Sequence, residues 1–201
     1  RHFLSFFKEA DSSILLIGVG NLGEALLDGM LKKGLNVTAL AHSEEKAIKT
    51  AEKIIALSPQ TVRIYPTVVL KGTYLADLYL SGEYKPLNAD ESAQLCAKLV
   101  LLFEKNNIKI IRLGLHSSED IKKNMLAGGY HECLGEMVAS KIMLNRITSY
   151  PPGKYQVYVN EKSISKLLGN KKSNLEELKN AGYEIFIEYD NTLAPNEVRV
   201  G

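Results

Sequence analysis

One stretch decides the fold: Arg63-Ile-Tyr-Pro-Thr-Val-Val-Leu-Lys-Gly-Thr-Tyr-Leu-Ala-Asp-Leu-Tyr-Leu-Ser-Gly-Glu-Tyr-Lys-Pro-Leu87. An apolar strand over 62–65 runs into Pro66, which has no backbone N–H to continue a ladder. The loop Lys71-Gly72-Thr73 follows, and then one short helix and a Gly-Glu-Tyr-Lys-Pro turn. Parallel α/β folds bind their ligands at the carboxyl ends of strands. The stretch therefore predicts a ligand-binding edge beside a buried strand.

On both sides of this stretch, apolar strands and amphipathic helices alternate with short links. This alternation predicts an α/β fold with a parallel sheet and right-handed crossovers, either an incomplete (β/α) barrel or an open sheet. The expected strands are 13–17, 36–40, 62–65 and 108–113; the expected helices are 22–33, 43–57 and 88–104, and further helices fill much of 118–148, with a break at Gly128-Gly129.

The order of expected strands and helices changes after Tyr150-Pro-Pro-Gly153. The composition of this segment is typical of a domain boundary. We expect a partial (β/α) barrel or Rossmann-like domain over 1–149 and a small α+β module over 150–201. The module follows the order βααβ, with expected strands 155–159 and 183–189, expected helices 161–168 and 173–181, and one more strand over 197–200.

Composition excludes several classes of protein. The 201 residues carry a net charge of +2, which gives no global field for nucleic acid. No apolar run approaches the ~18 residues of a membrane span, so we expect no membrane partner and a cytoplasmic location. Because the chain begins with Arg1, we interpret its start as truncated or processed. Cys96 and Cys133 make neither a zinc site nor a disulfide framework, and we expect both to be small core residues.

A glycine loop follows the first expected strand, in the phrase Ile14-Leu-Leu-Ile-Gly18-Val-Gly20-Asn-Leu-Gly23. Gly18 permits a tight turn, Gly20 lets a pyrophosphate approach the backbone, and Gly23 lets the helix pack on the strand. The sequence over 14–43 resembles the N-terminal segment of pyrroline-5-carboxylate reductase. This resemblance implies a dinucleotide site. Ala41, His42 and Ser43 stand where an acidic residue would select NAD, and Ser43 with the nearby Lys46 would lie near a 2′-phosphate, which favours NADP. The alternative is that the glycines only close a strand–helix turn.

The middle of the chain carries a second resemblance, in the stretch 63–87, in Asn107-Ile-Lys-Ile-Ile-Arg-Leu-Gly-Leu115 and in Gly128-Gly-Tyr-His-Glu-Cys-Leu-Gly-Glu-Met-Val-Ala-Ser-Lys141. From about Ala47 to Arg146 the chain resembles radical-SAM enzymes related to the Elongator catalytic subunit, including coproporphyrinogen-oxidase-like proteins. The resemblance implies S-adenosylmethionine and a [4Fe–4S] cluster. That cluster needs three thiolates from a Cys-x3-Cys-x2-Cys loop, which this chain lacks. We therefore expect a fragment, a degenerate paralogue, or a fusion of a dinucleotide-type unit with a late barrel.

Five residues in this middle part are candidates for the site. His131 and Lys71 are the catalytic candidates, since a histidine can act as acid or base near neutral pH. Tyr65, Gly72 and Thr73 are candidates to contact a cofactor, because they lie at or beyond the end of a strand. The alternatives are a packing role for Tyr65, a helix cap for Thr73 and a structural His131. No residue pattern indicates the small-molecule substrate.

The C-terminal module resembles the core of a KH domain over 155–188. In KH domains a G-x-x-G loop between two helices clamps the backbone of nucleic acid. The corresponding residues are Gly169, Asn170, Lys171 and Lys172, where a lysine replaces the second glycine and two positive charges attract phosphate. The resemblance implies RNA as a partner. The alternative is a docking module with no RNA role.

These observations together predict a radical-SAM-family fragment or paralogue linked to RNA modification. The alternatives are an NADP-binding reductase that resembles pyrroline-5-carboxylate reductase, and a non-catalytic RNA-binding or adaptor protein. No metal site is expected from this chain's own residues.

Overall fold

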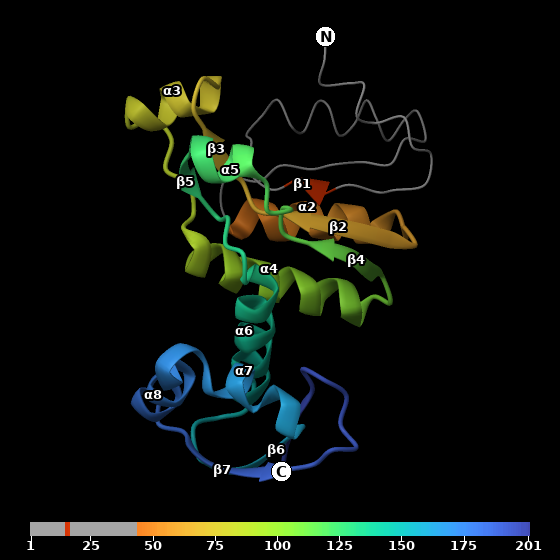
Figure 1. Ribbon diagram of the computed structural model, residues 1–201. Coiled ribbons are helices and arrows are strands. Elements are labelled where there is room, and N and C mark those ends of the chain that lie inside the picture. Colours follow the sequence, from red (N-terminus) through yellow and green to blue (C-terminus); the bar gives the residue numbers. More distant parts are fainter. Residues whose placement is uncertain (1–14, 17–43) are drawn as a thin grey trace. The chain divides into compact units, whose positions relative to one another are not determined.

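The computed structural model describes residues 15–16 and 44–201 (Figure 1). The chain divides into two compact units, Arg1–Glu132 and Cys133–Gly201. In the described ranges, no helix is both long enough and apolar enough to cross a bilayer.

The first unit contains a parallel sheet with the strand order β1-β2-β4. Its strands are β1 (Leu15–Leu16), β2 (Thr61–Tyr65) and β4 (Lys109–Leu113), and both neighbouring pairs run parallel. This confirms the expected α/β fold with a parallel sheet. Strands β1 and β2 are direct neighbours, with Leu15 paired with Ile64 and Leu16 with Tyr65. Among the described residues the sheet is therefore open, and it does not close into a barrel.

Two helices, α2 (Glu44–Ala56) and α4 (Ala89–Lys105), accompany this sheet and pack against each other (Figure 1). Helix α4 begins at Asn88, where the side chains of Asn88 and Glu91 form a reciprocal capping box. Ile64 of β2 and Phe103 of α4 are completely buried. Each such side chain contributes roughly 1.5–3 kcal/mol through its removal from water. These contacts hold β2 and β4 firmly, and their carboxyl ends form a fixed edge.

A second pair of strands in the first unit was not expected. After Pro66 the chain forms β3 (Val68–Leu70), which pairs antiparallel with β5 (Met125–Gly128). Strand β5 therefore interrupts the helices expected over much of 118–148, and α5 (Glu119–Asn124) is short. Periodicity cannot reveal a strand of four residues that only a distant partner stabilises. Helix α3 (Tyr74–Leu80) follows β3.

The second unit has its own sheet, with the order β7-β6-β8. The pair β6–β7 is parallel and the pair β6–β8 is antiparallel. Met143, Leu144 and Ile147 of α6 pack with Val157 and Val159 in one hydrophobic core. Helix α6 therefore belongs to the second compact unit, Cys133–Gly201. The elements are α6 (Leu134–Thr148), β6 (Lys154–Val159), η2 (Glu161–Ser163), α7 (Ile164–Leu168), η3 (Asn170–Lys172), α8 (Ser173–Asn180), β7 (Glu184–Tyr189) and β8 (Val198–Val200).

Candidate functional site

The carboxyl ends of β1 and β2 lie side by side, which is the edge that the sequence indicated. Tyr65 is the last residue of β2 and is the register partner of Leu16 in β1. The N–H of Gly114, just after β4, donates to the carbonyl of Ile64 at 2.9 Å. The glycine loop begins two residues beyond Leu16, but Gly18, Gly20 and Gly23 lie outside the described residues.

The glycines that precede His131 are fixed by close packing. The N–H of Gly129 donates to the carbonyl of Thr67 at 2.9 Å. A Cβ on Gly128 would lie 2.5 Å from that carbonyl oxygen, and a Cβ on Gly129 would lie 2.7 Å from the Pro66 side chain. Only residues without a side chain fit here. The predicted break at these glycines is therefore the point where β5 ends against the segment after β2.

The structure separates Lys71 from His131. Val68 pairs with Gly128 at one end of the β3–β5 ladder, and Leu70 pairs with Met125 at the other. The N–H of Lys71 donates to the carbonyl of Asn124 at 2.9 Å, beyond the second end. Three residues of strand span roughly 10 Å. The two catalytic candidates therefore sit at opposite ends of this ladder, while Tyr65 lies at the same end as His131.

Local structure accounts for Thr73 and Gly72. The Thr73 hydroxyl accepts a hydrogen bond from the N–H of Ala76 at 3.2 Å and donates to the carbonyl of Leu70 at 2.7 Å, so it caps α3. Gly72 has φ +73°, a conformation that side chains disfavour. Both residues are exposed. Contact with a cofactor remains a prediction for them.

His131 is exposed and lies beside an ion pair that sequence reasoning missed. The Lys122 Nζ lies 2.6 Å from Glu132 Oε1. The hydrogen bond and charge of Lys122 hold the pKa of the Glu132 carboxyl below its usual range, and Ser117 and His131 contribute less. The Tyr130 hydroxyl is buried without a hydrogen-bond partner among the described residues. No sequence signal joins Lys122 to this group, since α5 and β5 bring it there.

Two arginines occupy paired positions on neighbouring strands of the sheet. Arg63 of β2 and Arg112 of β4 are register partners next to an irregularity between Val62 and Arg63. Both are half-buried. Guanidinium groups bind carboxylates and phosphates through paired N–H donors. The register of β2 and β4 brings these two positions together, and no local sequence signal pairs them.

In the second unit, the loop between α7 and α8 has an unusual backbone. Lys171 has φ +50° and Lys172 has φ +65°, and both side chains are exposed. Gly169 has φ +74°, and a Cβ there would lie 2.8 Å from the Asn174 side chain. The buried Asn174 amide donates to the carbonyl of Leu167 at 3.1 Å and to Ser140 Oγ at 2.9 Å. Asn174 thereby anchors the loop from beneath while the lysines remain in solvent.

The cysteines do not fit an iron–sulfur cluster. The whole chain has two, fewer than the three thiolates required. Burial raises the pKa of the Cys96 thiol to about 12, so this thiol stays protonated. Cys133 is exposed, contrary to the expectation of a core residue. In the part of the chain that the structure describes, no three His, Cys, Asp or Glu side chains are grouped to hold a metal ion.

Comparison with known protein families gives matches for both resemblances found in the sequence, the radical-SAM one and the reductase-like one. Residues 59–144 match the family model of the Radical_SAM C-terminal domain. Residues 13–69 match the model described as NADP oxidoreductase coenzyme F420-dependent. The radical-SAM and reductase-like resemblances are thus confirmed at this level. Strand β2 belongs to both matched ranges.

A further match concerns one curated protein. The uncharacterized protein MJ0486 of Methanocaldococcus jannaschii is 38% identical over 50 residues. The matched segment covers 25% of this chain and 16% of that protein.

Proposed function

We propose that this chain works as the C-terminal section of a radical-SAM enzyme of the Elongator catalytic type, and that its second unit brings RNA to that enzyme. The match of 59–144 to the Radical_SAM C-terminal domain carries the first part of the proposal. Within that range, Tyr65 ends β2, and His131 follows β5, whose last residue Gly128 pairs with Val68 of β3. We assign Tyr65 and His131 to the ligand-binding edge, since they lie at the same end of the β3–β5 ladder.

The cluster and S-adenosylmethionine chemistry must be supplied by cysteines outside this sequence. This chain's residues would bind and orient the substrate: Arg63 and Arg112 would hold an anionic group, and His131 would exchange a proton with solvent or substrate. Lys71 would act from a separate position, because its backbone lies at the far end of the ladder.

The test begins with the DNA upstream of this coding region. We expect it to encode a Cys-x3-Cys-x2-Cys barrel, in the same frame or in an adjacent gene. Anaerobic assays of that barrel with and without this chain would measure 5′-deoxyadenosine. The proposal is supported if adding this chain increases the release of 5′-deoxyadenosine and if the His131→Ala variant of this chain increases it less. Release that is the same with and without this chain contradicts it.

RNA binding is proposed for the loop Gly169–Lys172. The support is the exposure of both lysines and the firm anchorage of the loop by Asn174. Replacing Lys171 and Lys172 with alanine should weaken RNA binding and reduce the slope of log K against log salt by about 2. The matched control replaces two exposed lysines away from the loop, Lys162 and Lys179. Equal affinities for the two double variants would remove the loop from the proposal.

A second function has its own support. The 13–69 match and the parallel pairing of β1 with β2 favour NADP binding by the glycine loop. Titration with NADPH, followed by its fluorescence, should give saturable binding that Gly20→Glu abolishes. Gly135→Glu is the control, since nothing lies within 4 Å of a Cβ at this exposed helical position. Absence of binding at millimolar NADPH would rule out this function.

A further inference from the structure

Strand β7 is an edge strand of the second sheet. It pairs with β6 along its whole length, from Glu184 to Tyr189. In the sheet order β7-β6-β8 its other side has no partner among the described residues. A free edge presents backbone donors and acceptors that another strand can use.

Hydrogen bonds identify the residues that face this free edge. The N–H groups of Glu184 and Asp190 donate toward β6, to the carbonyls of Gly153 and Val159, at 2.9 and 3.0 Å. Backbone groups alternate in direction along a strand. The N–H and C=O groups of Ile185, Ile187 and Tyr189 therefore point outward, away from β6.

This edge lacks the usual features that prevent strand addition. Its sequence, Glu-Ile-Phe-Ile-Glu-Tyr, contains no proline or lysine, and its pairing with β6 has no bulge. Phe186 and Tyr189 are 51% and 61% exposed. If another element packed on this strand, these two side chains would be buried. The β-branched and aromatic residues also favour the extended conformation.

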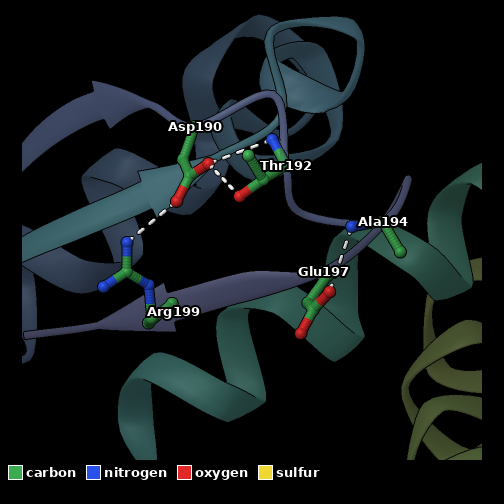
Figure 2. Close-up of polar contacts among 5 residues, drawn as sticks. All are labelled: Asp190, Thr192, Ala194, Glu197 and Arg199. Atoms are coloured by element: carbon green, nitrogen blue, oxygen red, sulfur yellow. Dashed lines mark hydrogen bonds and ion pairs between the residues drawn. The ribbon is translucent and has the colours of Figure 1, made fainter.

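The charges on this strand select the occupant. Glu184 and Glu188 flank Phe186 on the face opposite the core, since Ile185 and Ile187 pack inward. Glu184 forms an exposed ion pair with Lys154 of β6 at 2.8 Å, whereas Glu188 has no ion-pair partner among the described residues. Asp190, just beyond β7, is already engaged by Arg199 and Thr192 (Figure 2). A second copy centred antiparallel on Phe186 would place Glu184 opposite Glu188, which is unfavourable. Acidic side chains also repel the phosphates of RNA. A basic strand has the complementary charge.

We propose that the free edge of β7 accepts an extended segment of a partner protein with the alternation basic–x–apolar–x–basic. The partner's backbone would pair with Ile185, Ile187 and Tyr189. Its basic side chains would face Glu184 and Glu188, and its apolar side chain would cover Phe186. This interaction is independent of the proposed enzymatic and RNA roles.

The probe is a fluorescein-labelled peptide, Thr-Lys-Val-Tyr-Val-Lys-Thr, titrated with the full chain and followed by anisotropy. We expect saturable binding that weakens about tenfold when Glu184 and Glu188 are both replaced by lysine, as two reversed cross-strand charge pairs would give. The matched control, Glu176→Lys with Glu177→Lys, makes the same charge change on α8 and should bind as the original chain does. Circular dichroism checks that the variants are folded.

A second measurement leaves the protein unchanged. Methylation of alternate backbone nitrogens of the peptide, in the register that removes its donors toward β7, should abolish binding, whereas the opposite register should not. If neither methylation of the peptide nor the glutamate replacements change the affinity of the peptide for the chain, the proposal is wrong. Loss of RNA affinity in Phe186→Ala, or a dimer in sedimentation that Phe186→Asp dissociates, would assign the surface to RNA or to a second copy and also overturn it.

Discussion

The loops Lys71–Thr73 and Gly169–Lys172 both lead into a helix, but their backbones are stabilised in opposite ways. In the first, glycine takes the positive φ and Thr73 caps the helix. In the second, two lysines take positive φ and no side chain caps α8. A left-handed lysine costs roughly 1–2 kcal/mol relative to an ordinary conformation. Local structure explains the first loop, whereas the second keeps charged side chains where glycine would be more stable.

The largest expected effect tests how the second loop is held. Asn174→Ala should destabilise the second unit by about 2–3 kcal/mol, because several buried acceptors lose their amide donor. Urea unfolding followed by circular dichroism measures this. Asn170→Ala, in the same loop but exposed, should change stability by less than about 0.5 kcal/mol. Equal losses in the two variants would show that Asn174 is not the anchor.

The first loop should depend on its glycine. Gly72→Ala should destabilise the first unit by about 1 kcal/mol through backbone strain alone, because nothing lies within 4 Å of the added Cβ. Gly135→Ala adds a Cβ into similarly open space in α6, and it should stabilise by about 0.5–1 kcal/mol. Thermal unfolding compares the two variants. A shift of the same sign in both would contradict the strain argument.

The second loop should respond in the opposite direction. Lys172→Gly should stabilise the chain by somewhat less than about 1 kcal/mol, since glycine relieves the strain but also loosens the unfolded chain. The same variant should bind RNA more weakly. Lys179→Gly, in the last turn of α8, should destabilise, by less than the roughly 1 kcal/mol that glycine costs in a helix interior. If Lys172→Gly is destabilising as well, then the positive φ of Lys172 does not destabilise the folded chain, and the strain argument is wrong.

The smallest effect compares two carboxylates by pH. Lys122 lowers the pKa of Glu132, whereas hydrogen bonds from Thr192 are the main cause of the lowered pKa of Asp190. Both groups stabilise the folded state above their ordinary pKa, and that contribution is lost as the pH falls through the lowered pKa. Because salt screens exposed ion pairs, NMR titration in high salt should restore the pKa of Glu132 more than that of Asp190. Equal shifts would contradict these causes.

Part of the site could be predicted from sequence because it depends on nearby residues. The loop after 62–70, the capping potential of Thr73 and the tight turn at Gly128-Gly129 are all local signals. The antiparallel pair β3–β5 could not be predicted, since its register partners Leu70 and Met125 are 55 positions apart in the sequence and each strand is very short. That pair is what separates Lys71 from His131 and brings Lys122 to Glu132.

The sequence by itself determined the alternation of helices and strands, the parallel sheet, the approximate boundaries of α2, α4 and α8, and the lack of cluster thiolates. These follow from hydrophobic period, capping residues and composition, which are properties of neighbouring residues. Only the tertiary structure decided that β1 lies directly beside β2, that Arg63 faces Arg112, that α6 joins the second core and that β7 is left at an edge. Such pairings depend on which distant strands share backbone hydrogen bonds, and no local pattern records that choice.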